Sequence, residues 1–458
     1  MQGEERKNAI IRSLEAMKRE NLARIAELSD RVSIFEYEHM TTSGGAGRIW
    51  TQALQAALRE HEIVKIPAAD APYYIDAPVL IPSDRRIEAS PGAVICLAPQ
   101  VRLLMLRSEH TKDGTHMPFG DEEQDSNISI SGGRWEESNT QRAGYGKTGM
   151  YDEERSLYGV STCMLFNNID RLTLTDMVFA HTAAFAVQLG NAKNVVIENI
   201  RFEQGYADGI HINGNTENVL VRNISGEVGD DLVALNTYDW QNSSVNFGPG
   251  KNILCENIVA AVTGKYKSIR LEQGVYTYDD GSQVDCSLTD ALIKGARGMN
   301  TFKMYYQTPR YRIGEEPEKG APGTLDGIFF EDIDIDLNAP VDSFPEYLDS
   351  DPVRGWFGAF ELGSNIGYLS LKDIRIRLYP EKFPLTRLVV VGPKSIRRGE
   401  YEIFDPYISN TVDCIELENI TVNGIKADDA QALVRVTEFD DINGDGRSDG
   451  KGVLKKIF

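Results

Sequence analysis

The chain is poor in cysteine and contains no long apolar run. Five cysteines occur among 458 residues, they are scattered, and none forms a C-x-x-C pair, so neither a zinc knuckle nor a disulfide framework is indicated. No run of 18 or more apolar residues occurs, which argues against a transmembrane helix. The first residues hold no apolar segment behind a positive start, so we expect no secretory signal peptide. These absences predict a cytoplasmic protein in a reducing compartment.

Basic residues are scarce relative to acidic ones. The chain has 48 Lys and Arg against 69 Asp and Glu, which gives a formal net charge of −21. Nucleic acids and anionic membranes are polyanions, so this balance argues against both as partners. An anionic sugar is not excluded, because a local basic cleft can outweigh the global charge. With 41% hydrophobic and 26% charged residues, the composition is that of a folded globular chain.

The N-terminal segment has the pattern of an amphipathic helix over residues 4–30. Ile10, Leu14 and Met17 recur at helical spacing, and we expect the helix to cover one end of the fold. An oligomerisation helix is the alternative. A second, short helix is expected over residues 50–58, followed by a strand over 63–67, and together they suggest an N-terminal cap on the first coil.

From about residue 45 onward the sequence changes to many short β-rich runs, which align as a repeat. Segments 193–200, 217–224 and 251–258 share one pattern, in which Asn follows Lys or Glu and a second Asn-Ile pair closes the run. Counted from a weaker copy at Asp176, the closing positions 176, 199, 223 and 257 lie 23, 24 and 34 residues apart. Further weak copies close at positions 332, 373 and 419. Such a repeat indicates a solenoid.

Each run alternates apolar and polar residues, so one face of its strand must be buried. Stacking successive coils at about 4.8 Å buries that face in a continuous core. The repeated Asn or Asp suits a turn and can bond its equivalent in the next coil. The leucine-rich repeat signature is absent, and no helical pattern separates the strands. We therefore predict an all-β fold, a right-handed single-stranded parallel β-helix with an N-terminal helical cap.

The predicted organisation is one folded domain with an extension. Residues 1–44 form an N-terminal helical extension, and residues 45–458 form the parallel β-helix catalytic domain. Segments 340–358 and 378–412 are rich in Pro, Tyr, Asp and Gly and are expected to be long loops.

The densest acidic segment lies on two adjacent predicted coils. Asp208 and Asp230 are 22 residues apart, close to one coil, so we expect them above one another. Carboxylates this close repel, and one should hold its proton at neutral pH, as acid-assisted glycoside cleavage requires. Asp231 can join the same site only if the chain bends, and Gly229 makes a bend plausible. The alternatives are aspartates in ordinary turns and a calcium site.

The motifs at 128–135 (ISISGGRW), 208–211 (DGIH) and 229–231 (GDD), in this order, resemble glycoside hydrolase family 28, the polygalacturonases and their relatives. The resemblance covers roughly residues 45–310 and places the chain with the pectin-lyase-like parallel β-helix proteins. It implies that Asp230 is the general acid, while Asp208 and Asp231 position and activate water for single-step inversion. It implies no metal and no cofactor.

Two departures from the family pattern concern the substrate. Where the family has G-H-G this chain offers Gly264-Lys265-Tyr266, and where it has R-I-K the nearest match is Thr301-Phe302-Lys303. The missing arginine leaves galacturonate specificity open. Lys265, Arg270 and Lys303 nonetheless suit a basic cleft for an anionic sugar, although they also suit solvated strand faces.

Three more residues complete the predicted substrate-binding set. His211 follows Asp208 by three positions, and we expect a supporting role near the carboxylates in preference to direct catalysis. Trp240 and Tyr305 can stack on sugar rings, or they can pack internally. Near the C-terminus, residues 441–449 resemble the start of a calcium loop, but Gly452 stands where the bidentate glutamate is needed, so we interpret the segment as a tight acidic turn.

The leading functional hypothesis is a polygalacturonase-like glycoside hydrolase that acts by inversion, and from chain ends, on an oligo- or polysaccharide. A polysaccharide lyase or sugar epimerase on the same fold is the runner-up, with Lys265, Arg270 or Lys303 as the base. A non-catalytic carbohydrate-binding β-helix is the third hypothesis, and the aspartate cluster argues against it.

Overall fold

The structure is a computed structural model that describes residues 2–99, 101, 104–111, 124–137, 151–152, 157–158, 162–239, 244–261, 269–278, 280–305, 311–312, 321–338, 358–384, 386–392, 396–398, 402–404, 409–440 and 448–458. In these ranges, no helix has the length and hydropathy needed to cross a bilayer. All five cysteines are free thiols.

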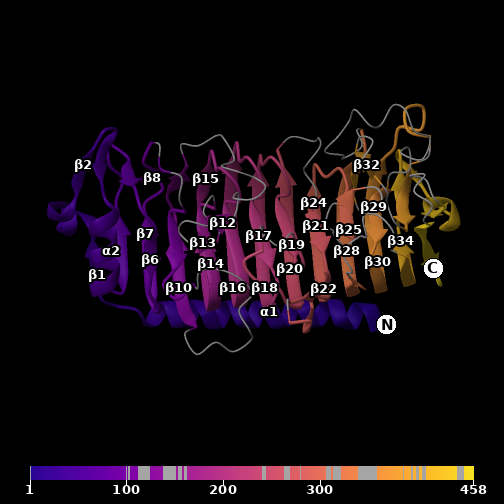
Figure 1. The fold of residues 1–458 in the computed structure, drawn as a ribbon, viewed down its shortest axis with the longest axis horizontal. Coiled ribbons are helices and arrows are strands. Elements are labelled where there is room, and N and C mark those ends of the chain that lie inside the picture. The colour runs from indigo at the N-terminus through magenta and orange to yellow at the C-terminus, as the bar shows by residue number, and fades with distance from the viewer. Residues whose placement is uncertain are drawn as a thin grey trace.

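The chain winds into a parallel β-helix, in which each strand pairs in parallel with the corresponding strand one coil later (Figure 1). This confirms the fold predicted from the repeat. Three sheets run along the solenoid, and they are called here the site sheet, the helix-covered sheet and the third sheet. The long strands β14 (Met164–Thr175) and β16 (Val187–Glu203) bend at corners and so contribute to more than one sheet.

The site sheet carries the candidate active site. It consists of β6 (Val79–Ile81), β9 (Leu106–Ser108), the first residues of β14 and β16, β17 (Ile210–Asn213), β19 (Val233–Asn236), β21 (Ile269–Glu272), β25 (Phe302–Tyr305), β29 (Gly358–Gly363), β31 (Arg387–Val391) and β37 (Val434–Val436).

The other two sheets complete the coils. The helix-covered sheet consists of β1 (Arg31–Ser33), β4 (Ile63–Ile66), β7 (Arg85–Ala89), β10 (Asp125–Ser131), the later residues of β14 and β16, β18 (Thr216–Gly226), β20 (Gly250–Ala260), β24 (Leu288–Arg297), β28 (Thr324–Asp336), β30 (Asn365–Arg377), β34 (Asn410–Glu418) and β39 (Ser448–Leu454). The third sheet begins with β3 (Gly47–Ile49), β5 (Tyr73–Ile75), β8 (Val94–Leu97), β11 (Arg134–Glu136) and β15 (Val178–Ala180).

Shorter strands lie outside these ladders or pair locally. They are β2 (Thr42–Gly44), β12 (Tyr151–Asp152), β13 (Leu157–Tyr158), β22 (Gly274–Thr277), β23 (Gln283–Asp285), β26 (Tyr311–Arg312), β27 (Ala321–Pro322), β32 (Ile396–Arg398), β33 (Glu402–Phe404), β35 (Thr421–Val422), β36 (Ile425–Lys426) and β38 (Glu438–Asp440). Strands β31, β32 and β33 correct the expectation of one long loop over 378–412. The run Leu388–Val391 is buried and extends the site sheet by one coil, because β31 pairs with β29 and turns Val389 and Val391 into the core.

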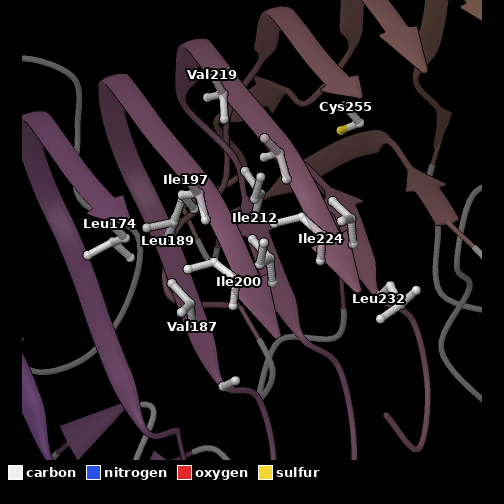
Figure 2. Packing of buried hydrophobic residues seen from close by; sticks show 14 of the residues in the cluster. Leu174, Val187, Leu189, Ile197, Ile200, Ile212, Val219, Ile224, Leu232 and Cys255 are labelled. Carbon is white, nitrogen blue, oxygen red and sulfur yellow. The ribbon is translucent and has the colours of Figure 1, made fainter. Parts of the chain in front are cut away.

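The core is a stack of apolar side chains that point inward from each coil (Figure 2). Val187, Ile210 and Val233 lie in register on successive strands of the site sheet and have no exposed surface. Farther along, Phe302 and Phe360 are neighbours in the same row, with stacked rings 5.0 Å apart. Since each coil buries its face only against the next, the core is continuous along the solenoid.

The repeated Asn and Asp residues form the corners of the coils, as predicted. Each of the seven closing positions has a left-handed backbone, with φ between 54° and 60°, namely Asp176, Asn199, Asn223, Asn257, Asp332, Asp373 and Asn419. Asn and Asp tolerate this conformation better than other side chains. Their amides also form a ladder, in which Asn223 donates to Asn199 and Asn257 donates to Asn223, both at 2.8 Å.

Helix α1 (Gln2–Glu27) lies along the side of the solenoid and crosses many coils (Figure 1), so the expectation that it covers one end was wrong. Its residues Ile10, Leu14 and Met17 pack on an outward-facing apolar row of the helix-covered sheet, made by Val196, Leu220, Leu254, Leu292 and Phe329. The same row continues as Thr173 on one side and as Ser370 on the other. The row is therefore apolar only where the helix covers it.

Ion pairs fix the helix in this position. Arg6 bonds Asp290 at 2.7 Å and Asp326 at 3.0 Å, and Lys18 pairs with Glu198 at 2.6 Å. The end of the solenoid is capped instead by α2 (Thr51–Glu60), as predicted for residues 50–58, which packs on the 3-10 helix η1 (Ile34–Met40). A second 3-10 helix, η3 (Gln431–Leu433), precedes β37. Strand β1, inside the predicted extension, already pairs with β4.

Candidate active site

Three aspartates meet at the turns that lead into two adjacent strands of the site sheet. Asp208 precedes β17, and Asp230 and Asp231 precede β19. One carboxylate oxygen from each lies within 4.8 Å of the other two. Asp208 and Asp231 are 4% and 1% exposed, whereas the side chain of Asp230 is 27% exposed. The prediction that these residues share one site is thus supported by geometry, and Asp230 is the member open to a ligand.

The vertical alignment of the cluster differs from the expected one. Ile210 pairs with Val233, and continuing this register back by two residues aligns Asp208 with Asp231, not with Asp230. The backbone N–H of Asp231 donates to Oδ1 of Asp208 at 3.1 Å. The coil is therefore 23 residues long at this point, equal to the first repeat interval, and Asp230 projects beside the aligned pair.

A bend at Gly229 allows consecutive aspartates to face the same site. Residues 229 and 230 form a bend outside any strand. A Cβ on Gly229 would lie 1.8 Å from the carbonyl oxygen of Tyr206, so only glycine fits at this approach. This meets the condition set by the sequence, because two neighbours on a regular strand point to opposite faces.

Arg270 on β21 holds the acidic groups together. Its Nε lies 2.9 Å from Asp231 Oδ2, its Nη2 lies 3.4 Å from Asp230 Oδ1, and its Nη1 lies 3.4 Å from Glu272 Oε1. Glu272 is 1% exposed. The sequence pointed to Arg270 as a substrate-binding residue. In this structure the guanidinium instead neutralises part of the charge of three carboxylates.

His211 on β17 lies between two carboxylates. Its Nδ1 is 2.6 Å from Asp208 Oδ2 and its Nε2 is 3.0 Å from Asp239 Oδ2. The ring is 1% exposed and stacks on Phe185 at 3.9 Å. Burial lowers the pKa of His211, but the hydrogen bonds to Asp208 and Asp239 outweigh this and raise the pKa to about 9. The ring thus supports the site, and a direct substrate contact would require release of one of these bonds.

Asp239 was missed by the sequence reasoning. It follows β19 in a connecting segment outside the repeat, where acidic residues are common, so only its distance of eight residues from Asp231 hinted at a role. It is 6% exposed and also accepts a bond from Asn236 Nδ2 at 3.2 Å.

The outward row of the site sheet that contains His211 continues toward the C-terminus through charged residues. His211 aligns with Ala234, Ala234 with Arg270, Arg270 with Lys303, and Lys303 with Glu361. Lys303 and Glu361 are each 7% exposed. The structure therefore brings two of the predicted basic residues, Arg270 and Lys303, onto neighbouring strands beside the aspartates.

Toward the N-terminus the same row is covered by residues 244–247, called here the wall. Val245 packs with Leu104 and Leu165, and its N–H donates to Asn213 Oδ1 at 3.1 Å. Gly190 lies beneath it, where a Cβ would come within 2.7 Å of Val245. The wall therefore crosses strands β14, β16 and β17 on the face that carries the site.

The remaining predicted site residues are Trp240, Lys265 and Tyr305. Trp240 and Lys265 lie outside the described residues, as do residues 441–447 of the calcium-like segment and residues 340–357 of the first predicted loop, whose last residue, Gly358, begins β29. Tyr305 ends β25, where it aligns with Gly363 on β29. Their assigned roles stay predictions.

Comparison with known proteins establishes the fold. No protein-family model matches the chain, and no curated protein matches it by sequence. Among solved structures, an exopolygalacturonase from Thermotoga maritima is 9% identical with a TM-score of 0.50, over 90% of this chain and 97% of that one. A tailspike protein double mutant of E. coli bacteriophage HK620 is 12% identical with a TM-score of 0.50, over 86% and 63%.

A family 28 exopolygalacturonase from Yersinia enterocolitica is 15% identical with a TM-score of 0.42, over 93% of this chain and 79% of that one. At these identities the likeness concerns the architecture and not the chemistry. The chain therefore has a parallel β-helix fold, as these solved structures do.

Proposed function

We propose that this protein is a glycoside hydrolase whose catalytic residues are Asp208, Asp230 and Asp231. The observation that carries the proposal is the convergence of three carboxylates, from two adjacent coils, within 4.8 Å. Acid-assisted cleavage of a glycosidic bond needs one carboxylic acid and at least one carboxylate in such proximity.

In the proposed reaction Asp230 is the general acid, because it is the exposed member of the cluster. Its proton passes to the glycosidic oxygen as the bond from that oxygen to the anomeric carbon breaks. The oxygen of a water molecule forms the new bond to the anomeric carbon, and Asp208 and Asp231 accept its proton. Arg270 keeps Asp231 and Glu272 as partners when Asp230 carries the proton.

Inversion at the anomeric carbon is part of the proposal and follows the family resemblance. The carboxylate oxygens lie closer together than the roughly 6.5–9.5 Å that is usual between the two acids of inverting enzymes. Proton NMR of the first-formed anomer tests this step, since a retained configuration would contradict it.

The wall supports an exo mode of action. A polysaccharide bound across the strands of the site sheet would extend over several coils on both sides of the aspartates. Residues 244–247 occupy the N-terminal side, where Val245 is 3% exposed and packed on Leu165. A sugar chain can therefore continue only toward Arg270 and Lys303, which places a chain end at the aspartates.

The charged row supports an anionic sugar as the substrate. Arg270 already pairs with Asp230, Asp231 and Glu272, so the cation that we assign to a sugar carboxylate is Lys303, its neighbour on β25. A uronate-containing oligosaccharide is accordingly the proposed substrate class, and a cytoplasmic location would suit imported oligosaccharides.

The ion pairs of Arg270 argue against this residue as the base of a lyase, which leaves Lys265 and Lys303 as the candidates for that reaction. A lyase or epimerase needs a base that removes a proton beside the uronate carboxylate, and an arginine bound to two aspartates stays protonated. A non-catalytic carbohydrate-binding protein would bind the same sugars without turnover.

The experiment uses wild type and Asp230→Asn with a panel of uronate and neutral oligosaccharides. Reducing ends and ultraviolet absorbance are followed together. The proposal predicts new reducing ends without absorbance, and a loss of at least about 100-fold in the variant, the usual scale for removing a general acid. Rising absorbance, or full activity in Asp230→Asn, would overturn it. The product sizes test exo action, because shortening by single end units is expected and mid-chain fragments would contradict the wall.

A further inference from the structure

We infer that His211 is a doubly bonded imidazolium that joins Asp208 to Asp239, and that it acts as a positioning residue for the proposed hydrolysis. The inference rests on the proposed function and adds two members, His211 and Asp239, to its machinery. Neither is proposed to touch the substrate.

The two carboxylate contacts of the ring are met together when both ring nitrogens donate. Asp208 Oδ2 lies 2.6 Å from Nδ1, and Asp239 Oδ2 lies 3.0 Å from Nε2. An ionised carboxylate only accepts hydrogen bonds, and a neutral imidazole has a single N–H. Two ionised partners, on opposite sides of one ring, are therefore both satisfied only by the imidazolium.

The surroundings add no competing cation next to the ring. In the site-sheet register His211 lies between Gln188 and Ala234, both uncharged. The ring face is covered by Phe185. Asn213 Nδ2, which can only donate, lies 3.2 Å from Nε2, and Asp239 Oδ2, at the shorter distance of 3.0 Å, is the partner that we assign to the Nε2 proton. Among the described residues named around the site, the nearest charges beyond Asp208 and Asp239 are those of Asp230, Asp231 and Arg270 on the next coils.

The amides around the ring are themselves fixed by a buried chain of hydrogen bonds. Thr162 Oγ1 donates to Gln188 Oε1 at 3.1 Å, and Gln188 Nε2 donates to Asn213 Oδ1 at 3.0 Å. Asn213 also donates to the carbonyl oxygen of Asn236 at 3.2 Å. Thr162 and Asn236, at the two ends of this series of hydrogen bonds, are less than 2% exposed. The plane of the imidazole is therefore set by packed protein neighbours and not by solvent.

This arrangement has a consequence for catalysis. The bond to Oδ2 pairs a cation with the carboxylate that is proposed to accept a proton from water. The bond also fixes the rotation of the carboxylate, so that Oδ1 is presented toward Asp231, whose N–H it accepts at 3.1 Å. Asp239, which is not a member of the aspartate cluster, contacts Nε2 on the opposite side of the ring from Asp208. It therefore helps to stabilise the positive charge of His211.

The first test is the charge state of His211 in the wild-type protein, measured by long-range ¹⁵N–¹H correlation NMR with ¹⁵N-labelled histidine. The chain contains six histidines, and His211→Gln assigns the resonance by its disappearance. Both ring nitrogens should carry protons at pH 7, and the ring should lose a proton only near its raised pKa of about 9. A neutral ring at pH 7 would overturn the inference, whether or not a substrate has been found.

The second test is Asp239→Asn, which keeps the shape of the site and removes one negative charge. Removal of a carboxylate within hydrogen-bond distance should lower the titration of His211 by about 1 unit or more. Because loss of the Asp230 proton affects both proteins, the alkaline limb is read as the ratio of kcat in Asp239→Asn to kcat in wild type, and this ratio should fall as pH rises through the lowered titration of His211. KM should stay unchanged, because Asp239 does not contact the sugar. Asp30→Asn, which removes the partner of the remote His61, is the matched control and should leave the profile unchanged.

The outcomes separate the two proposals. If wild type hydrolyses no glycan while His211 is an imidazolium, the proposed function fails and the charge assignment stands. If wild type is active and Asp239→Asn has an unshifted alkaline limb and an unchanged kcat, the positioning role is refuted. Recovery of the profile by Asp239→Glu, which restores the charge, supports the role, and no recovery at a correctly folded site opposes it.

Discussion

Replacing Leu14 with alanine should loosen helix α1 from the side of the solenoid without unfolding the coils beneath it. Leu14 has no exposed surface and packs on the apolar row of the helix-covered sheet. A buried Leu→Ala change costs about 2–5 kcal/mol. Helix α1 is held on the coils by this face, by its ion pairs and by hydrogen bonds such as that from Asn21 to the carbonyl oxygen of Asn194. The cost should therefore fall on docking of the helix, which opens locally while the coils stay folded.

The size of the effect follows from that cost. At about 1.4 kcal/mol for each factor of ten, undocked helix should become roughly 30-fold to several thousand-fold more populated. Limited proteolysis reads this population directly, since basic cleavage sites such as Arg12 and Arg24 are accessible to trypsin only when the helix opens. The opened form also exposes Leu220 and Leu254, so binding of a hydrophobic dye should rise in parallel.

Leu22→Ala is the matched control, because Leu22 lies on the same helix but is 47% exposed. Its effect should stay within about 0.5 kcal/mol. Equal proteolysis of Leu14→Ala and wild type would refute the packing argument. An equal response to Leu14→Ala and Leu22→Ala would show that helix propensity, and not burial on the coils, controls docking.

Three further changes test other parts of the structure. Asn223→Ala should destabilise the protein more than Asn223→Gly in chemical denaturation, because alanine pays about 1–2 kcal/mol for a left-handed backbone while both lose the ladder bonds; equal losses would show that the corner conformation does not matter. Gly229→Ala should abolish turnover while wild-type-like circular dichroism is kept, since its Cβ would meet the Tyr206 carbonyl at 1.8 Å; normal turnover would contradict the bend. Burial raises the pKa of Glu137 to about 8, against an opposing bond from a backbone N–H, so its native form is protonated where the unfolded form is not. Its contribution to stability should therefore decline as pH rises from about 4.5 to 8, and Glu137→Gln should remove that slope; an unchanged slope in denaturation at several pH values would argue against a buried neutral acid.

The repeat alone was sufficient to predict the coils and their corners. Asn199, Asn223 and Asn257 stand at the same point of each repeat, and the structure gives all three a left-handed backbone and mutual hydrogen bonds. Such local features can be predicted from sequence, because Asn tolerates the left-handed conformation and its side chain can bond the backbone of a turn. The position of α1 on the solenoid could not be predicted from the sequence. An apolar stripe shows that one face of a helix is buried, but it does not identify the surface against which that face packs.

The aspartate cluster was predicted in membership but not in alignment. The spacing of 22 residues suggested Asp208 above Asp230, whereas the strand register aligns Asp208 with Asp231. A difference of one residue in coil length is set by the turn, where Gly229 approaches the backbone of Tyr206, and the repeat does not encode it. Asp239 was absent from the prediction because it lies in a connection between coils, where sequence periodicity carries no information about contacts.

Arg270 illustrates the same limit for a single residue. A basic side chain near a predicted site suggests contact with an acidic substrate, and its actual partners depend on side-chain packing across coils. The structure places it within 3.4 Å of Asp230 and Glu272 and 2.9 Å of Asp231, which changes its role from recognition to charge balance.

The central claim, that Asp208, Asp230 and Asp231 catalyse hydrolysis of a glycosidic bond, is tested most directly by the masses of the products from a defined uronate oligosaccharide. Hydrolysis predicts two saturated products whose masses together exceed that of the substrate by one water, formed by wild type and lost in Asp230→Asn. Products that sum to the substrate mass and include an unsaturated sugar would contradict the account, as would undiminished hydrolysis by the variant.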